Sequence, residues 1–444
     1  MQATSTLSIL RLTWPTILSN MIYMLLALAC LKIAGQMGAD AVTAVTTGQR
    51  LYFFLHAFIM GFCSATTALV GAYWGADNRA MAAHFASLSV LLFFTLGCLI
   101  SSLALAFPET LVDLFGLSGQ ARAQAVEFFV WTAVFAPAIV LTLIFNMALR
   151  AIGDSLTPLC IGVVSFAISL SLCLFFSLGW RDYPALGVKG LALGCGIGAA
   201  ITVIAVTCLW LLGKLSLPVT NPLPNIRANT RRLLSIGFPA AFEQIAFQSG
   251  VLIFLGFLTT YGNAPFAAYG IGISLLSLII VVAFSFAISG ATLVSQHLGA
   301  GDADGAYQAG WRTMRTAFYI MLIGAIIMRY SASPLAHFMI IDPQVVHYVI
   351  QVIHILCLCM PLMAIEFSIA GALRGAGDTR YPMLVTLFSI GISRVIAPLI
   401  LLQMQLDVIW LFYTTLLDYL IKSSLIMARF RSKKWLLKSN KSRI

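Results

Sequence analysis

Two pairs of matching segments decide the fold of this sequence. The segment LVGAYWGADNRA at 69–80 matches LVSQHLGAGDAD at 293–304, and ALRAIGDSLTP at 148–158 matches ALRGAGDTRYP at 372–382. One shift relates both pairs, because 293 − 69 = 224 and 372 − 148 = 224. A single ungapped shift indicates duplication of a unit of about 220 residues. The shift also joins these positions: Pro15 with Pro239, Gly38 with Gly262, Gly48 with Gly272, Gly75 with Gly299, Pro137 with Pro361, and Arg150 with Arg374.

The composition indicates a protein dissolved in lipid. Of 444 residues, 60% are hydrophobic and 9% are charged, whereas a soluble domain carries about 25% charged residues. A water-soluble fold of this length would expose far too much apolar surface. The first apolar run, which begins near Leu12, is too long for a signal peptide, so we interpret it as the first membrane span.

Twelve apolar runs are long enough to cross the hydrocarbon layer, which takes about 20 residues. They lie near 13–37, 46–73, 86–107, 123–149, 158–179, 187–213, 233–260, 266–296, 308–333, 345–372, 383–404 and 408–430. We therefore predict an all-α integral membrane protein of about twelve transmembrane helices in two six-helix lobes. The predicted parts are an N-lobe at 1–214, a cytoplasmic loop at 215–230, a C-lobe at 231–432 and a basic cytoplasmic tail at 433–444.

An even number of spans in each repeat returns the chain to its starting side of the membrane. The two repeats are therefore expected to be parallel, related by a pseudo-two-fold axis along the membrane normal. Transporters of this kind bind their substrate near the midplane and rock one half against the other. This layout favours a transporter over a receptor or a membrane-embedded enzyme.

The basic residues predict the side of the membrane that each loop faces. With a cytoplasmic N-terminus, inner loops and tails carry 18 Lys and Arg residues and outer loops carry 4, while the remaining 4 of the 26 lie in spans. This asymmetry predicts a multi-pass protein of the inner or plasma membrane with both termini in the cytoplasm. The net charge of +11 is then a feature of the membrane surface, and no nucleic-acid partner is expected.

The nine cysteines form no metal-binding pattern in the sequence. The chain has no CxxC pair and no Cys/His cluster at zinc spacing, so we expect no metal site. Almost all of the cysteines lie in apolar runs, and we interpret them as small buried thiols.

Several loops resemble those of a known transporter family. They are LRAxGD at 149–154, LRGxGDT at 373–379, the GA(G/D) turns after the second and eighth helices, and GFP at 237–239. Over nearly its whole length the chain is similar to the multidrug and toxic compound extrusion (MATE) family. The resemblance implies two six-helix lobes and antiport, in which an amphipathic, often cationic compound leaves the cell while H⁺ or Na⁺ enters. We therefore predict a monomeric exporter whose partners are this substrate, the coupling ion and membrane lipid, with no other cofactor.

Ionisable side chains inside spans are costly and are functional candidates by default. We predict that Glu243 and Glu366 couple the ion. Proline removes a backbone hydrogen bond and kinks a helix, so Pro15 and Pro239 are candidate hinges. Beside these kinks, each repeat carries polar residues that we assign to the substrate cavity: Ser19, Asn20, Gln244 and Gln248. A structural hydrogen-bond cluster between helices is the alternative.

Three further interpretations concern charged residues. Glu366 is eight residues before Arg374, which places it about 12 Å inward from the cytoplasmic loop at the helical rise of 1.5 Å per residue. The alternative role of Glu366 is a structural pair with a base such as Arg394. Asp418 is a cavity candidate, although its spacing from Lys422 favours an ion pair on one helix face. The loop residues Arg150 and Arg374 are interpreted as gating or structural residues that can cap helix carbonyls.

The sequence departs from the proton-coupled members of the family in the first lobe. The resemblance implies acids near the middle of the first helix and in the fifth helix, and cysteines stand there, at Cys30 and Cys173. This moves the predicted coupling to the C-lobe. The first lobe instead offers Lys32 as a counter-charge in the substrate cavity, and the alternatives are a buried ion pair or a side chain that extends to the membrane interface. Two membrane histidines are candidates for proton relays or for packing: His56 and His354.

Other classes of function have less support in the sequence. The sequence has no HExxH, GxSxG or P-loop motif, which argues against a membrane enzyme and against ATP-driven transport by this chain alone. A lipid-linked precursor flippase of the same superfamily and an exporter of a metabolite such as a siderophore remain alternatives. The identity of the substrate and the choice between H⁺ and Na⁺ are left open by the sequence.

Overall fold

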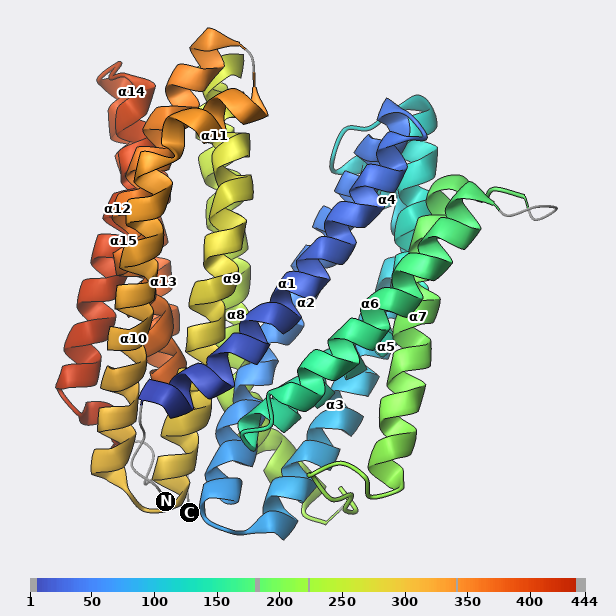
Figure 1. Cartoon of the computed structure of the whole chain (residues 1–444), viewed down its shortest axis with the longest axis vertical. Coiled ribbons are helices and arrows are strands. Elements are labelled where there is room, and N and C mark those ends of the chain that lie inside the picture. Colours follow the sequence, from blue (N-terminus) through green and yellow to red (C-terminus); the bar gives the residue numbers. More distant parts are fainter. Residues whose placement is uncertain (1–5, 180–183, 223, 341, 437–444) are drawn as a thin grey trace. The chain divides into compact units, whose positions relative to one another are not determined.

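The computed structural model describes residues 6–179, 184–222, 224–340 and 342–436, and in these ranges the chain forms helices and no strand (Figure 1). The elements are α1 (Thr6–Gly35), α2 (Ala39–Gly75), α3 (Arg79–Ala106), α4 (Pro108–Asp113), α5 (Gly119–Ala151), α6 (Leu156–Leu178), α7 (Gly187–Leu211), α8 (Ile226–Thr259), α9 (Asn263–Gly299), α10 (Ala303–Tyr330), α11 (Ala332–Met339), α12 (Pro343–Gly375), α13 (Arg380–Ile390), the π-helix η1 (Gly391–Ile396), α14 (Ala397–Gln403) and α15 (Val408–Arg431). Most of the predicted basic tail lies outside the described residues.

Each predicted span corresponds to one long helical segment. Within the described ranges, ten segments are long and apolar enough to cross a membrane, and α10 with α11, bent by 64°, would make an eleventh. The remaining long helix, α15, has 24 residues but carries Asp418 and Lys422 in its middle, which makes it less apolar. The expected all-helical membrane fold is thus confirmed.

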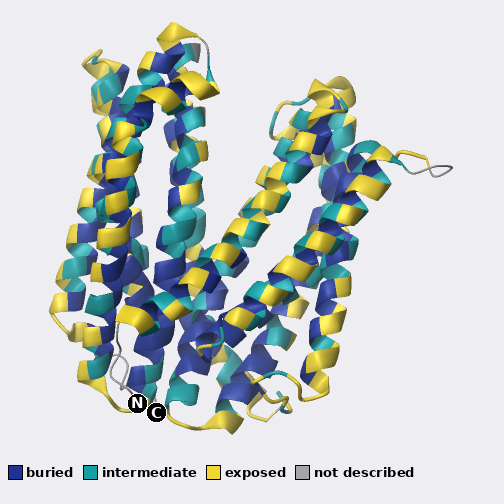
Figure 2. Cartoon of the chain, viewed as in Figure 1, coloured by how far each residue is buried: buried dark blue, intermediate teal, exposed yellow. Residues whose placement is uncertain are grey.

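The long helices present apolar side chains on their outer surfaces. Leu99 and Leu103 on α3 are 62% and 64% exposed, and Ile323 and Ile327 on α10 are 58% and 62% exposed. Residues four apart share one face of a helix, so these leucines and isoleucines form apolar stripes. Exposed positions recur along the long helices beside buried ones (Figure 2). Such stripes fit a lipid environment and would be a liability in water.

The chain divides into two compact units. We call Trp14–Ser235 the N-unit, and Ile236–Ile444 together with Met1–Thr13 the C-unit. In the N-unit, α6 packs against α7, and α5 packs against α2, α3 and α7; in the C-unit, α12 packs against α9, α10 and α15. The start of α1 belongs to the C-unit, because Ile9 lies in its apolar core and Thr13 donates a hydrogen bond to Ser289 at 2.9 Å.

The repeated loop motifs have a common structural cause. After α2 and after α9 the chain turns through a left-handed residue, Asp77 (φ 57°) or Gly301 (φ 80°), and a side chain then caps the next helix. Asn78 accepts from Met81 N at 3.0 Å, and Asp302 accepts from Gly305 N at 2.7 Å. The Gly305 N–H, with a smaller contribution from His297, lowers the pKa of Asp302.

The LRxxGD loops repeat in the same way. Gly153 and Gly377 both have positive φ, 94° and 81°, a backbone conformation that favours glycine. The shift of 224 residues therefore preserves turn geometry as well as sequence letters.

Candidate functional site

A cluster of ionisable side chains lies inside the C-unit. Each member is at least 85% shielded from solvent. Three acids face three bases, so the cluster carries no net charge when every member is ionised. Its members are Glu243 on α8, Glu366 and Arg374 on α12, Arg394 on η1, and Asp418 and Lys422 on α15.

Glu243 and Arg374 form a two-point ion pair. Arg374 Nη2 donates to Glu243 Oε1 at 2.7 Å, and Arg374 Nε donates to Oε2 at 3.3 Å. Thr386 Oγ1 on α13 also donates to Oε1, at 3.2 Å. Paired donors of this kind are the strong form of the arginine–carboxylate contact. The interpretation of Arg374 as a cap for helix carbonyls is therefore wrong, because its guanidinium points at Glu243.

Asp418 is held by three groups. Lys422 Nζ donates to Oδ2 at 3.0 Å, and Ser389 Oγ donates to Oδ1 at 2.6 Å. Arg394 Nη2 lies 3.7 Å from Oδ2, and its guanidinium also stacks over the Phe254 ring. The predicted pair of Asp418 with Lys422 at i, i+4 is confirmed.

Glu366 differs from the other two acids. Its side chain is 6% exposed, yet among the described residues it makes no hydrogen bond and no ion pair at bonding distance. Its carboxylate interacts over a longer range with Lys422 and Arg374, which attract it, and with Glu243 and Asp418, which repel it. The alternative pairing of Glu366 with Arg394 is not formed, since Arg394 lies on Asp418.

Arg394 reaches the cluster from an irregular segment. The span Arg380–Gln403 widens into the π-helix η1 at Gly391–Ile396, and Arg394 and Ser393 are the buried residues of that segment. A single π-turn inside an α-helix often occurs at a functional site. A hydropathy pattern does not distinguish a π-turn from an α-turn, so the unusual arginine is the only signal for it in the sequence.

The N-unit has the matching contact without the acid. Arg150 Nη2 donates to Ser19 Oγ at 2.9 Å, and Arg150 and Ser19 are the equivalents of Arg374 and Glu243 under the shift of 224. Close by, Asn146 Nδ2 donates to Tyr23 Oη at 3.0 Å. The duplication therefore repeats the contact between the two helices, but in the N-unit the arginine binds a neutral hydroxyl in place of a carboxylate.

The structure places the other predicted cavity residues on α1 and α8. Gln244 and Gln248 are half-buried on α8, as is Asn20 on α1, whereas Lys32 is exposed. Pro15 and Pro239 lie inside α1 and α8 as predicted, but their action as hinges stays a prediction.

Each of the two membrane histidines has a polar neighbour of its own. His56 lies beside Tyr52 Oη on its own helix, at 3.4 Å. His354 contacts Arg329 and is twelve residues from Glu366 along α12, about 18 Å of helical rise. Their role as proton relays stays a prediction.

The interpretation of the cysteines needs correction. Cys160 and Cys208 are exposed, so they are not buried thiols. More important, Cys30, Cys173 and Cys195 gather from α1, α6 and α7 into one cluster that could hold a metal ion. Sequence spacing could not predict this cluster, because ligands on three separate helices have no characteristic spacing.

Comparisons with known proteins agree with this architecture. The MatE family model matches residues 15–175 and again residues 239–399. The two matches are related by the shift found in the sequence, because 239 − 15 = 224 and 399 − 175 = 224. The chain belongs to the MATE family. It is therefore a multi-pass membrane transporter and not an enzyme, and the drug and metabolite efflux of this family is the function that it shares.

Three relatives illustrate the likeness. The probable multidrug resistance protein NorM of Thermotoga maritima is 25% identical over 438 residues, which covers 96% of this chain and 92% of that protein. The FAD transporter of Shewanella oneidensis is 24% identical over 341 residues, 77% of this chain and 75% of that one. A MOP superfamily transporter from Pyrococcus furiosus has the same fold, with a TM-score of 0.87, 19% identity and coverage of 99% and 97%.

Proposed function

We propose that this MATE transporter expels amphipathic organic compounds in exchange for protons, and that Glu366 is the residue that takes up the proton. One observation carries the proposal: of the three acids in the buried cluster, Glu366 alone has no direct partner in the described structure. Glu243 and Asp418 would have to break short ion pairs before they could be protonated. Glu366 has no such contact to lose.

Charge balance supplies the link to the substrate. With all six groups ionised, three positive and three negative charges cancel. A proton on Glu366 leaves one positive charge in excess in a region of low dielectric, where charges interact far more strongly than in water. The cluster then repels a cationic group that it tolerated before. Proton entry from outside would favour release of a cationic substrate to the outside, which is the cycle of an antiporter.

The oxygen atoms of the cluster favour H⁺ over Na⁺. A hard cation needs several oxygen ligands at once. Both oxygens of Glu243 accept hydrogen bonds from Arg374, and one of them also accepts from Thr386. Both oxygens of Asp418 accept from Ser389 and Lys422. A proton needs only one free oxygen, and Glu366 can offer it.

The mixed charge of the cluster also bears on the substrate. Three guanidinium or ammonium groups stand beside three carboxylates, so the C-unit does not favour a simple lipophilic cation alone. Relatives of this chain are named as multidrug resistance proteins and as an FAD transporter. We infer substrates that combine an apolar body with polar or charged groups of both signs. The transporter would act as a monomer in the inner membrane, with both termini in the cytoplasm.

The test is transport by purified protein in liposomes. A pH gradient and a Na⁺ gradient are imposed in separate experiments, and the movement of an amphipathic cationic dye is followed. We expect the pH gradient to drive dye movement, the Na⁺ gradient to have no effect, and Glu366→Gln to reduce the rate at least tenfold, to that of empty liposomes. Glu243→Gln, which disrupts the second predicted coupling residue, should also reduce it.

The matched control is Glu127→Gln. Glu127 is exposed, and its ion pair with Lys189 Nζ is long, at 3.8 Å. The same change of acid to amide should therefore leave transport intact at this position. Full proton-driven transport by Glu366→Gln would exclude Glu366 as the coupling residue. Transport driven by Na⁺ alone would show that the proposed ion is wrong.

A further inference from the structure

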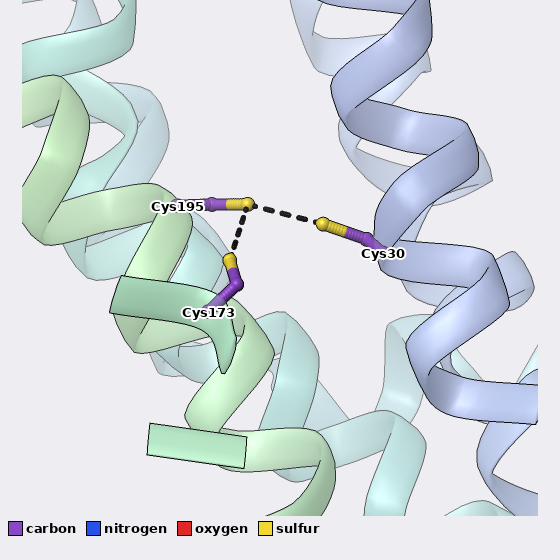
Figure 3. A group of neighbouring side chains, drawn as sticks. All are labelled: Cys30, Cys173 and Cys195. Atoms are coloured by element: carbon purple, nitrogen blue, oxygen red, sulfur yellow. Dashed lines mark hydrogen bonds between the residues drawn. The ribbon is translucent and has the colours of Figure 1, made fainter. Parts of the chain in front are cut away.

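Three thiols from three helices meet in the apolar core of the N-unit. Cys30 Sγ on α1 lies 3.4 Å from Cys195 Sγ on α7, and Cys173 Sγ on α6 lies 3.5 Å from Cys195 Sγ (Figure 3). All three sulfur atoms lie within 4.8 Å of one another. Cys30 and Cys173 are buried, whereas Cys195 is partly exposed. The group therefore has three converging sulfur atoms and one thiol through which a ligand can enter.

Glycines on α7 make this convergence possible. A Cβ atom on Gly194 would lie 2.4 Å from the backbone nitrogen of Cys173, and one on Gly190 would lie 2.5 Å from the backbone of Phe176. A Cβ on Gly198 would lie 2.2 Å from Ser169 Oγ. Glycines four apart form one helix face, and in membranes such faces allow close packing of helices. Because α6 and α7 approach so closely, the thiol of Cys195 reaches that of Cys173.

We propose that Cys30, Cys173 and Cys195 form a three-sulfur binding site for a trivalent thiophilic metalloid, arsenic(III) or antimony(III). The geometry is suitable for one central atom. A trivalent metalloid keeps a lone pair and bonds pyramidally, so three sulfurs at about 2.3 Å from it, the length of a metal–thiolate bond, lie roughly 3.4 to 3.5 Å apart. Two of the distances between the sulfurs are 3.4 Å and 3.5 Å, and the third is at most 4.8 Å. Small rotations of the side chains would equalise them.

The number and charge of the donors select the class of ligand. No histidine or carboxylate of the described chain joins the cluster, and its neighbours in the core are apolar residues such as Ile33, Leu170 and Leu191. Three thiolates around a monovalent ion carry a net charge of −2, and around a divalent ion −1. A trivalent centre with three thiolates is neutral. Because an uncompensated charge in an apolar interior is costly, the trivalent centre fits best.

The binding reaction needs no oxidant or reductant. Arsenous acid, As(OH)₃, enters as a neutral molecule. Three S–H bonds and three As–O bonds break, three As–S bonds form, and each hydroxyl group leaves as water with the proton of one thiol. The oxidation state of arsenic stays at three. Cys195, the partly exposed thiol, would react first, and the buried pair would then complete the site.

Binding of arsenite to the purified, reduced full-length protein tests the proposal. Bound arsenic is measured by elemental mass spectrometry after desalting, and its neighbours by X-ray absorption at the arsenic edge. We expect one arsenic per chain with three sulfur neighbours. In Cys195→Ser we expect two sulfur neighbours and one oxygen, with affinity at least tenfold lower. The double variant Cys160→Ser/Cys208→Ser removes the two exposed thiols and should bind as the unmodified protein does.

Three results would overturn the proposal. The first is oxygen neighbours around arsenic in the unmodified protein, a measurement that does not depend on any variant folding. The second is undiminished binding by Cys195→Ser, or by Cys195→Ala as a second variant. The third is tight binding of Cu(I) or Zn(II) by the same three thiols when arsenite does not bind, which would assign the site to an ordinary soft metal ion. None of these results bears on Glu366, which belongs to the other unit.

Discussion

At the scale of single residues, duplication kept a contact and changed its chemistry. Arg374 binds the carboxylate of Glu243, whereas its equivalent Arg150 binds the hydroxyl of Ser19. Arg150 is buried, and the side chain of Arg374 is 12% exposed. A buried arginine beside a buried carboxylate neutralises it, and each group depends on the other. The hydroxyl of Ser19 has no charge that needs neutralising.

This difference predicts unequal costs for the same substitution. Arg374→Leu leaves Glu243 charged, buried and without its main partner, and loss of one member of a buried pair costs about 3–5 kcal/mol. Arg150→Leu leaves a neutral hydroxyl, for which a lost hydrogen bond costs about 1–3 kcal/mol. We therefore expect Arg374→Leu to lower the thermal unfolding midpoint of the protein in detergent more than Arg150→Leu does.

A double variant separates charge from packing. Glu243→Gln combined with Arg374→Leu removes both charges. We expect the double variant to recover part of the stability that Arg374→Leu loses, because the stability effects of substitutions at two contacting residues are not additive. Equal destabilisation by Arg374→Leu and Arg150→Leu, with no recovery in the double variant, would mean that the ion pair adds nothing beyond packing.

The sequence could predict only part of the site. The pair of Asp418 with Lys422 was visible because the residues are four apart on one helix. Glu243 and Arg374 are 131 residues apart, so only three-dimensional packing shows that they bind each other. The resemblance to the family singles out two of the three clustered cysteines, Cys30 and Cys173, but the sequence position of Cys195 does not connect it to them.

At the scale of elements, helix contacts depend on small residues at defined positions. Gly190, Gly194 and Gly198 form the face of α7 that meets α6, where a Cβ atom would lie 2.2–2.5 Å from its neighbours. Their spacing of four residues is present in the sequence and could have predicted the close packing of α7 against another helix. The π-turn of η1 could not have been predicted, because it changes the backbone hydrogen bonds without changing the hydropathy.

The glycine face predicts a specific effect of a single methyl group. Gly194→Ala forces α6 and α7 apart, and overpacking of this kind costs about 1–3 kcal/mol. We expect a lower thermal unfolding midpoint and weaker arsenite binding at the neighbouring cysteines.

Gly256→Ala is the matched control, since nothing lies within 4 Å of a Cβ at that position in α8. There alanine should stabilise the helix by about 0.5–1 kcal/mol. Unchanged stability of Gly194→Ala would show that α6 and α7 can separate at no cost.

At the scale of the whole molecule, the shift of 224 residues connects all levels of the structure. It relates repeated letters, left-handed turn residues, helix caps, the contacts of Arg150 and Arg374, and the two matches of the family model. The fold was predictable because the hydropathy pattern and the repeat agree. The chemistry of the two units was not, because it depends on the few equivalent positions at which they differ.

The repeat and the charge asymmetry together predict the orientation of both units in the membrane. Two pairs of identical residues offer a direct test, because 300 − 76 = 224 and 344 − 120 = 224, and all four residues are exposed. Ala76 and Ala300 follow α2 and α9, on the side with most basic residues, and Gln120 and Gln344 lie at the start of α5 and α12. Each is changed to cysteine in a background that carries Cys160→Ser and Cys208→Ser.

If the repeats are parallel and the termini cytoplasmic, a membrane-impermeant maleimide applied to intact cells should label Gln120→Cys and Gln344→Cys. The same reagent applied to inverted vesicles should label Ala76→Cys and Ala300→Cys. Labelling of the two members of a pair from opposite sides would contradict the parallel repeat, whereas reversal of both pairs together would keep the repeat and invert the topology.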